Sequence, residues 1–293
     1  MAAVTEDNIT NEVCARYAGA ANPRTVTLMT GLVRHLHDYA REVQLTRDEW
    51  LTALDFLIRC GEMSDDKRNE MMLLSDVMGL SMLTVMIDQK VPPGATPNTV
   101  EGPFFIEGSP ELPPGGDMRF GAPGKLSFMT GRVTDMDGRP IAGALIDAWQ
   151  ADQNGLYECQ VGASDAYLRG KFHTDADGRY CVTTVEPCHY SIPIDGPVGE
   201  LVAATGISHE RPAHIHATVR APGHQTLITH IFRGGADYID SDAVYGVRPE
   251  LIIFFEDHEP GPTPAGTIAT EPFSTVTFDV VLAPAMERRL AAE

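Results

Sequence analysis

Residues 91–116 read VPPGATPNTVEGPFFIEGSPELPPGG and divide the chain into two parts of different character. Proline and glycine are too frequent in this stretch for a helix or a central strand to continue through it. The part before it has the spacing of helices, and the part after it has short runs typical of strands. We therefore predict an α+β protein with an all-helical domain at residues 1–95 and an antiparallel β-sandwich domain at residues 96–293.

The N-terminal part carries apolar residues at helical spacing. Those on one face of an expected helix from residue 25 to residue 43 recur at intervals of three and four: Leu28, Leu32, Leu36, Tyr39 and Val43. Thr46 and Glu49 form a capping box that opens a second helix. A third helix is expected from about residue 66 to residue 88.

After residue 116, short runs of strand-forming residues alternate with turn sequences. Asp-Gly pairs at residues 137–138 and 177–178 lie between such runs, and this placement is a strong hairpin signal. The expected strands lie at residues 128–133, 144–151, 180–185, 214–221, 226–232, 251–255 and 275–282. Repeated turns between alternating segments predict an antiparallel sandwich or barrel.

Composition and charge disfavour several kinds of partner. The formal net charge of −19 would repel phosphate, and no basic run offsets it, so we expect no nucleic-acid binding. No apolar run approaches the roughly 20 residues that cross a bilayer, so we expect no membrane insertion. The N-terminal MAAVTEDNIT is acidic where a signal peptide is basic, which favours a cytoplasmic protein. Five cysteines without a CxxC pair argue against a disulfide framework and a cysteine zinc site.

The segment RPAHIH, residues 211–216, holds the sharpest signal for metal binding. His214 and His216 are two apart on an expected strand, so both side chains lie on one face and can reach one ion. A histidine pair alone is more often a surface or core feature than a metal site. The residues alone also leave open a ferrous site of two histidines and one carboxylate.

Two tyrosines lie in settings that do not suit the packing of a strand face. Tyr157 is in NGLYE and Tyr190 is in EPCHYSIPIDGPVG, among proline, aspartate and glycine. For each tyrosine alone, a half-buried ring with a hydrogen-bonded hydroxyl is the simpler interpretation.

Four motifs taken together resemble the intradiol ring-cleavage dioxygenase family. They are EGPFF at 101–105, DAWQADQNGLY at 147–157, CHYSIPIDGPVG at 188–199 and RPAHIH at 211–216. Their order and separations match that family over nearly the whole chain, including the helical N-terminus. Four motifs in register are far more specific than the histidine pair alone.

The resemblance implies a non-haem Fe(III) site, one per subunit, with Tyr157, Tyr190, His214 and His216 as ligands. Phenolate is a hard anionic donor that favours a trivalent ion, and coordination lowers the pKa of tyrosine far below its reference of about 10. The implied reaction inserts both atoms of O2 into an aromatic diol. It cleaves the bond between the two hydroxyl-bearing carbons and yields a muconate-type diacid.

The resemblance also implies catalytic roles for three residues. Tyr190 is expected to be the labile ligand, which accepts a proton from the substrate. Arg211 matches the family's arginine beside the reacting carbon, where a guanidinium stabilises developing negative charge; the alternative is a surface arginine before a proline. His230 stands where many members have glutamine, and it can donate a hydrogen bond to the substrate.

The residues that match the family's substrate pocket are Leu73, Asp76, Val100, Glu101, Gly102, Pro103, Phe104, Ile192, Pro193 and Val244. A carboxylate among apolar residues is costly unless it meets a donor, and a third ring hydroxyl would supply one to Asp76. The alternative is that Asp76 faces solvent or pairs with an arginine. Glu101 stands where a bulky aromatic residue is expected, which is a departure from the hydroxyquinol enzymes.

The stretch from residue 238 to residue 264 resembles the hydroxyquinol-cleaving branch more than the catechol and chlorocatechol branches. We therefore expect hydroxyquinol (benzene-1,2,4-triol) as the substrate and 3-hydroxy-cis,cis-muconate, or its keto form maleylacetate, as the product. Catechol and substituted catechols are the alternative substrates. A β-sandwich binding module that has lost its metal is an alternative of another class.

The N-terminal helices have more apolar surface than a small isolated domain can bury. The resemblance implies a homodimer through these helices, and in this family the interface can hold a phospholipid. A closed helical bundle is the alternative.

Overall fold

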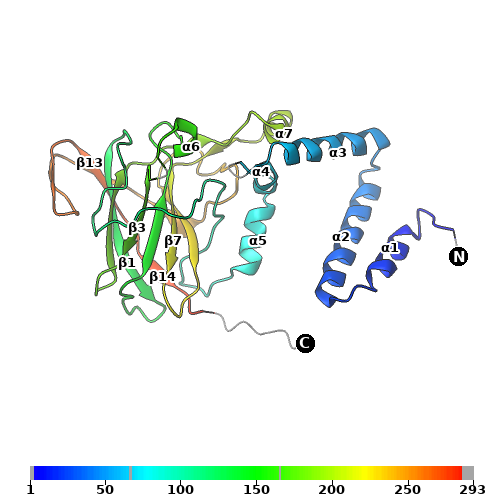
Figure 1. Ribbon diagram of the computed structural model, residues 1–293, viewed down its shortest axis with the longest axis horizontal. Helices are drawn as coiled ribbons and strands as arrows, with labels where there is room; N and C mark the ends of the chain where they lie inside the picture. Colours follow the sequence, from blue (N-terminus) through cyan, green and yellow to red (C-terminus); the bar gives the residue numbers. More distant parts are fainter. Residues whose placement is uncertain (1–2, 66–67, 165, 286–293) are drawn as a thin grey trace. The chain divides into compact units, whose positions relative to one another are not determined.

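Figure 1 shows a computed structural model of the chain, in which residues 3–65, 68–164 and 166–285 are described. The chain separates into two compact units, residues 1–59 and residues 60–293. The first unit is helical, and the second holds all the strands of the described residues. The predicted order of a helical part followed by a strand-rich part is thus confirmed, while the expected domain boundary after residue 95 stays a prediction.

The helices of the N-terminal part begin at caps that the sequence supplies. The side chain of Asn22 accepts hydrogen bonds from the backbone N–H groups of Arg24 (2.8 Å) and Thr25 (3.3 Å) at the start of α2. The capping box is present, because Thr46 N–H donates to Glu49 Oε2 (2.9 Å) and Glu49 N–H donates to Thr46 Oγ1 (3.3 Å). These helices are α1 (Ile9–Tyr17), α2 (Pro23–Glu42) and α3 (Arg47–Glu62).

In place of the single third helix that the sequence predicts, the structure has two helices, α4 (Glu70–Val77) and α5 (Leu80–Asp88). The chain bends by 79° between them. Gly79 is the cause, because its φ of 70° lies in the left-handed region that ends a helix. The expected start at Asp66 lies outside the described residues. No single helix of the described chain is long and apolar enough to cross a membrane, and α4 and α5 reach that length only as this bent pair.

Two five-stranded sheets form the second unit. In the first sheet β1 pairs with β4 on one side and with β13 and β14 on the other, and its strands are β1 (Leu126–Asp135), β4 (Arg179–Val185), β10 (Glu256–His258), β13 (Phe273–Thr277) and β14 (Val280–Leu282). The second has the order β3-β2-β7-β8-β9, with strands β2 (Leu145–Trp149), β3 (Arg169–His173), β7 (His214–Arg220), β8 (Leu227–Arg233) and β9 (Ile252–Ile253).

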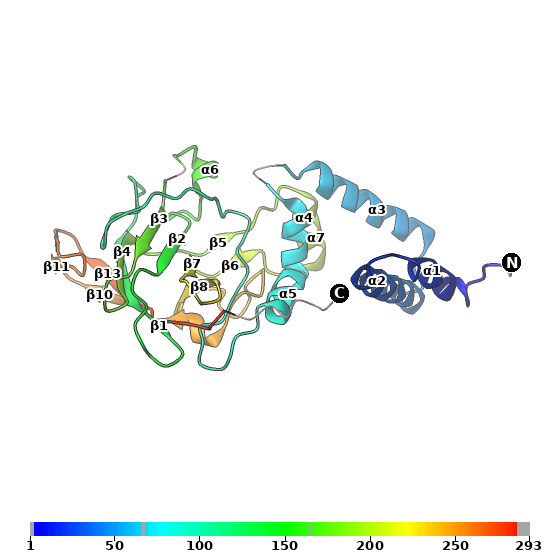
Figure 2. The same cartoon turned by 60° about the horizontal axis from the view of Figure 1, so that its bottom comes forward.

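Shorter elements connect the sheets. Two small ladders pair β5 (Tyr190–Ser191) with β6 (Glu210–Arg211) and β11 (Gly261–Pro262) with β12 (Ile268–Ala269). The remaining helices are α6 (Glu158–Val161), α7 (Pro197–Thr205) and the short 3-10 helix η1 (Pro249–Leu251). Figure 2 shows β5 and β6 between the larger sheets and the helices α4, α5 and α7.

The sheets are mixed, and the expectation of a purely antiparallel sandwich is wrong in this respect. β1 runs parallel to β13 and β14, and β8 runs parallel to β9. The expected strand at residues 275–282 is divided into β13 and β14, which pair with successive parts of β1. Long connections between these strands allow the parallel pairings, which a local turn signal cannot reveal.

The core lies between the two large sheets and contains residues from both. Val133, Val182 and Val276 come from the first sheet, and Ile146 and Ile215 come from the second. Because side chains alternate along a strand, the neighbours of Ile215 on β7, His214 and His216, lie on the opposite face of the second sheet. That outer face carries the candidate site.

A close backbone contact at Gly131 on β1 yields a stability prediction. A Cβ atom at this position would lie 1.9 Å from the Phe278 carbonyl oxygen, which accepts a hydrogen bond from the Tyr180 hydroxyl. We expect Gly131→Ala to lower the free energy of unfolding by about 3 kcal/mol, measured by urea denaturation. Gly261→Ala is the matched control, because its Cβ would meet only a carbonyl at 3.8 Å. Equal effects of the two variants would contradict the strand contact.

Candidate active site

Three histidines from two neighbouring strands gather on the outer face of the second sheet. His216 on β7 pairs with His230 on β8 and with Trp149 on β2 in the strand register. His214, His216 and His230 are buried, and their ligating nitrogen atoms lie within 4.8 Å of one another. The period of two along β7 thus brings the predicted histidine pair to one point, with a third histidine beside it.

The ring nitrogens of the pair are arranged for ligation. His214 Nδ1 lies 2.6 Å from the carbonyl oxygen of Pro212, so Nδ1 carries the ring proton and donates it there. Nε2 is therefore unprotonated, and its lone pair can bind a metal ion. His214 Nε2 and His216 Nε2 are 3.1 Å apart. Burial and the neighbouring Arg211 lower the pKa of His214 to about 3, and burial and His214 lower the pKa of His216 well below 6.5. Both imidazoles are therefore neutral, as metal ligands must be.

The two predicted tyrosines meet beside the histidines. The hydroxyl oxygens of Tyr157 and Tyr190 are 3.3 Å apart, and both side chains are buried. The ring of Tyr190 also faces His214, with 5.4 Å between the ring centres. Gly155 permits this approach, because a Cβ there would lie 2.4 Å from the Cβ of Tyr190. The loop after β2 and the short strand β5 are thus brought together by close packing.

The electrostatics of Tyr157 indicate what these four side chains can hold. Burial and the adjacent Tyr190 hydroxyl raise the pKa of Tyr157 well above 10, so the protein alone favours the neutral phenol. A bound cation reverses this preference and stabilises phenolate. Two nitrogens that are each about 2.1 Å from one ion lie about 3 Å apart at a right angle, which matches the observed histidine pair. Two phenol oxygens and two neutral nitrogens fit a hard, highly charged metal ion.

Each ring nitrogen of His230 has a side-chain partner, whereas Nδ1 of His216 has no hydrogen-bond partner among the described residues. His230 Nδ1 contacts Thr99 Oγ1 on one side, and Nε2 lies 3.3 Å from Arg211 Nη2 on the other. A hydrogen bond from the Thr99 backbone N–H to the Ile228 carbonyl (2.8 Å) fixes the position of Thr99. The three histidines together could hold a metal ion, and the family resemblance implies a hydrogen-bonding role for His230.

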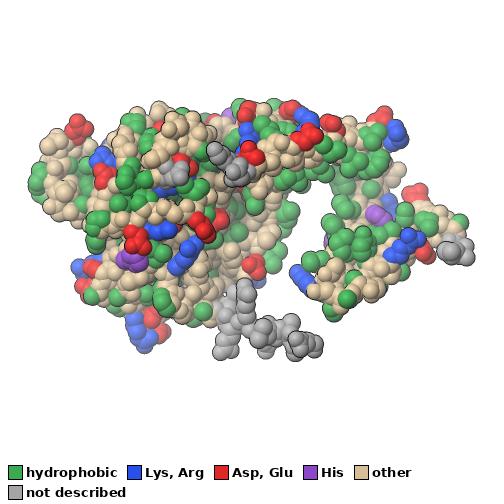
Figure 3. All heavy atoms as spheres, viewed as in Figure 1, with side chains coloured by type: hydrophobic (Ala, Val, Ile, Leu, Met, Phe, Trp, Pro, Cys, Tyr) green, Lys and Arg blue, Asp and Glu red, His purple; other side chains and the backbone are tan. Residues whose placement is uncertain are grey.

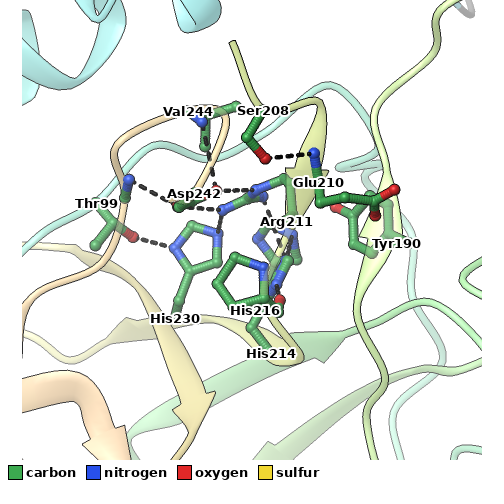
Figure 4. A network of polar contacts seen from close by, with 12 residues as sticks. Thr99, Tyr190, Ser208, Glu210, Arg211, His214, His216, His230, Asp242 and Val244 are labelled. Atoms are coloured by element: carbon green, nitrogen blue, oxygen red, sulfur yellow. Dashed lines mark hydrogen bonds and ion pairs between the residues drawn. The ribbon is translucent and has the colours of Figure 1, made fainter. Parts of the chain in front are cut away.

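Arg211 stands over the histidines and is bound to Asp242. Its Nε lies 3.1 Å from Asp242 Oδ1, while Nη1 lies 3.3 Å from His214 Nε2. Figure 4 shows the guanidinium with Asp242 on one side and the histidine rings on the other. Burial acts to lower the pKa of Arg211, but Asp242 and Tyr190 more than offset it and keep the pKa above its ordinary value. The interpretation of Arg211 as a surface residue is wrong, since only 3% of it is exposed.

Stacked rings and a second buried ion pair support the ligands. Trp149 stacks on His216 with 4.8 Å between ring centres, and Phe104 stacks on Tyr157 at 4.3 Å. Arg169 Nη2 donates to Glu158 Oε2 (2.7 Å) and to the Phe104 carbonyl (2.6 Å). The Arg169 guanidinium thus links Glu158, which follows Tyr157, to Phe104, which stacks on Tyr157.

Half of the predicted substrate residues line one cavity of about 650 Å³: Leu73, Pro103, Phe104, Ile192 and Pro193. The four predicted metal donors are not among its lining residues, but Phe104 both lines the cavity and stacks on Tyr157. We therefore interpret the cavity as the approach to the site.

The other predicted pocket residues lie outside that lining. Val100, Val244 and Asp76 are buried, and Glu101 is half-buried. Gly102 is packed against the ring of His216, because an added Cβ would lie 3.1 Å from Cε1.

Asp76 is buried, with 3% of its surface exposed, which excludes the alternative that it faces solvent. Burial raises the pKa of Asp76, while the Ser81 hydroxyl and the charge of Arg211 lower it to a smaller extent. Its side chain forms no ion pair within the described part of the chain. Asp76 and Leu73 are three residues apart on α4 and so lie on the same side of that helix.

Four supporting residues were not predicted from the sequence: Thr99, Glu158, Arg169 and Asp242. Glu158 directly follows Tyr157, which is the single local hint among them. Asp242 lies in the stretch that suggested the substrate, but nothing near it in sequence links it to Arg211. Their roles depend on pairings between segments that are far apart in the chain.

Most of the chain matches known protein families. Residues 100–284 match the family model described as "Dioxygenase", and residues 22–96 match the model described as "Catechol dioxygenase N terminus". The chain is 52% identical over 248 residues to 6-chlorohydroxyquinol 1,2-dioxygenase of Cupriavidus pinatubonensis, covering 84% of this chain and 90% of that protein. It is 43% identical to hydroxyquinol 1,2-dioxygenase of Nocardioides simplex, covering 96% of each.

The fold is similar to that of a solved relative. The crystal structure of hydroxyquinol 1,2-dioxygenase from Pseudomonas putida superposes with a TM-score of 0.89 at 39% identity, covering 96% of this chain and 99% of that one.

The different surroundings of His216 and His230 lead to a prediction about metal content. We expect His216→Ala to lower the metal bound per chain at least about tenfold, because a ligand is lost. His230→Gln should retain the metal, because an amide can replace both hydrogen-bonding groups of the ring. Elemental analysis of the purified proteins measures both. Equal metal loss in the two variants would mean that His230 is itself a ligand.

Proposed function

The chain belongs to the intradiol ring-cleavage dioxygenase family, and from that premise we propose that it inserts both atoms of O2 into hydroxyquinol. The product is 3-hydroxy-cis,cis-muconate, or its keto form maleylacetate. The observation that carries this proposal is the meeting of Tyr157, Tyr190 and the histidine pair at one buried point beside Arg211. A sandwich module without metal has no need of such a buried donor set.

The proposed cofactor is one non-haem Fe(III) per subunit, held by Tyr157, Tyr190, His214 and His216. Ferric iron held by these four residues would supply a Lewis acid for the diol oxygens and would make the ring reactive toward O2. The protein supplies two phenol oxygens, which as phenolates suit a trivalent ion, and two neutral imidazoles, of which His214 donates its ring proton from Nδ1 to the Pro212 carbonyl.

Tyr190 is the proposed acceptor of a substrate proton. It lies on the two-residue strand β5, whereas Tyr157 is enclosed by Phe104 and by the ion pair of Glu158 and Arg169. Tyr190 is also the more exposed of the two, at 8% against 1%. The looser setting supports Tyr190 as the tyrosine whose hydroxyl moves and accepts the proton.

Arg211 and His230 are proposed to act on the bound diol. The guanidinium of Arg211 is buried and fixed, so it can stabilise negative charge on the ring without reorganisation. A guanidinium nitrogen can only donate, so His230 Nε2, which lies 3.3 Å from Arg211 Nη2, accepts a hydrogen bond from it, and the ring proton lies on Nδ1 and is donated to the Thr99 hydroxyl. His230 is therefore proposed to act on the diol through Arg211.

Asp76 is the proposed determinant of the substrate. A buried carboxylate next to an apolar cavity wall requires donors, and the third hydroxyl of hydroxyquinol supplies one. Catechol lacks that hydroxyl, so with catechol bound the carboxylate would receive no hydrogen bond from the substrate. The apolar wall formed by Leu73, Ile192 and Pro193 suits the rest of the ring.

The helical unit is proposed to form a homodimer. Leucine side chains on α2 remain about half exposed, and Figure 3 shows hydrophobic side chains over α2 and α3. Such an apolar surface favours a second copy over the closed bundle, and it is the proposed place for a phospholipid. The exposed apolar residues of these two helices are Leu28, Leu32, Leu36, Tyr39, Trp50, Leu51, Leu54, Leu57 and Ile58.

The proposed compartment is the cytoplasm. Cys159, Cys181 and Cys188 of the sheet unit are thiols, and thiols persist in a reducing environment.

The reaction itself is tested by the fate of the oxygen atoms. With hydroxyquinol and isotopic O2, we expect one labelled oxygen in each of the two new carboxyl groups, measured by mass spectrometry. Catechol offered to the same protein serves as the comparison substrate. A yellow semialdehyde would show cleavage outside the diol and would refute the intradiol reaction.

The role of Asp76 is tested with the same two substrates. Asp76→Ala should lower kcat/KM for hydroxyquinol by about ten- to a hundredfold, because a hydrogen bond to a charged group contributes roughly 1.5–3 kcal/mol. Catechol turnover should stay the same or rise. Asp88→Ala, at an exposed position on α5, is the control for the change in charge. Equal losses with both diols would assign Asp76 a structural role.

A further inference from the structure

The Asp242 carboxylate lies in a turn and binds Arg211, and within the described residues it makes no hydrogen bond to the four proposed metal donors. We propose that Asp242 is a positioning residue, which holds the Arg211 guanidinium so that its Nη1 group faces the bound diol. This inference rests on the proposed function, because it concerns the direction in which Arg211 donates during that reaction.

The Asp242 carboxylate accepts hydrogen bonds from one edge of the Arg211 guanidinium. Asp242 Oδ1 lies 3.1 Å from Arg211 Nε, and Asp242 Oδ2 lies 3.5 Å from Nη2. This side-on approach uses the Nε edge and leaves Nη1 pointing away from the carboxylate. Arg211 is 3% exposed and Asp242 is 6% exposed, so water does not compete for these contacts.

The turn that carries Asp242 is fixed to the strand that carries Arg211. The Ala243 N–H donates to the Glu210 carbonyl (3.0 Å) on β6. The Gly246 N–H donates to Asp242 Oδ2 (2.8 Å), and the Val244 N–H lies 3.4 Å from Oδ1. The carboxylate therefore has little freedom to turn, and neither does the guanidinium that it binds.

The opposite edge of the guanidinium faces the histidines. Nη1 lies 3.3 Å from His214 Nε2, which is the acceptor that the described residues offer to this group. An imidazole nitrogen that binds a metal ion cannot also accept a hydrogen bond. With His214 engaged, Nη1 is the N–H group available to a ligand, while Nη2 still has His230 Nε2 at 3.3 Å.

Strand register brings this edge to the proposed proton acceptor. Arg211 on β6 is the direct partner of Tyr190 on β5. Side chains of directly paired residues lie on the same face, so a diol held beside the Tyr190 hydroxyl would lie on the side of the ladder that carries Arg211. Asp242 thus determines which of the three nitrogens of Arg211 meets the developing negative charge.

A double-mutant cycle with Arg211→Ala and Asp242→Asn tests the positioning role. Asp242→Asn alone should lower kcat for hydroxyquinol at least about tenfold, because misplacement of a catalytic group is costly. In the Arg211→Ala background the same change should alter kcat less than about twofold, since the group to be positioned is gone. Losses that multiply in the double variant would overturn the proposal. Asp240→Asn, an exposed carboxylate two residues away, is the matched control.

Substrate binding without O2 supplies a readout that is independent of turnover. Titration of the ferric protein with hydroxyquinol under anaerobic conditions follows the change in its visible absorption. We expect the Kd of Asp242→Asn to stay within about threefold of the unsubstituted protein, because the charge on the ring develops only during the reaction. A parallel loss of binding and of thermal stability would assign Asp242 a structural role and overturn the proposal.

Gly246→Ala keeps the inference testable if Asp242→Asn does not fold. Its Cβ would lie 3.2 Å from Asp242 Oδ2 and 3.4 Å from Arg211 Nη2, so it displaces the pair without changing any charge. A fall in kcat that disappears in the Arg211→Ala background supports the proposal, and a fall that persists there overturns it. Failure of the unsubstituted protein to consume O2 with any diol would instead refute the proposed function.

Discussion

The alternation of side chains along β7 is the constraint on which the site depends. Ile215, Ala217 and Val219 enter the core between the sheets, so His214 and His216 must lie on the outer face. A shift of one residue in the pairing of β7 would place histidines in the core and isoleucine at the site. The same pairing aligns Trp149 and His230 with His216. Core packing and the placement of the histidines that could hold a metal ion are therefore specified by one register.

An outer face that holds ligands must be covered, and the cover is made of irregular segments with buried charges. Two guanidiniums, Arg169 and Arg211, are almost completely enclosed, and each has a carboxylate partner. Such pairs are costly to desolvate and are weak sources of stability. Here the two pairs fix segments that lack long hydrogen-bonded ladders. Arg169 links Phe104 to the helix after Tyr157, and Arg211 links β6 to the turn that carries Asp242. Their contribution is to geometry more than to the free energy of unfolding.

The helical and strand-rich parts, the capping box and the histidine pair were predictable because each has a local pattern. The tyrosines required a resemblance, since a lone tyrosine in a loop has no local signature for metal binding. The break at Gly79 was not predicted, because a single glycine within an apolar run is tolerated in many helices. Parallel pairing of β1 with β13 and the partnership of Arg211 with Asp242 join residues that are far apart in sequence. Such contacts are set by tertiary packing and leave no periodicity to read.

The residues proposed for the chemistry and those proposed for substrate choice lie on different elements. The proposed metal donors lie on the sheet face and its adjoining loops, while Leu73 and Asp76 lie on α4. The position of α4 is set by Glu70, which is fully buried and accepts hydrogen bonds from Arg68 (2.9 Å) and from the Val198 N–H at the start of α7 (3.1 Å). A carboxylate at a helix N-terminus is stabilised by the dipole of that helix. Because Glu70 anchors α4 to α7, residues on the pocket side of α4 can change without disturbing the register of β7. An enzyme built in this way can alter which diol it accepts while its metal site stays the same.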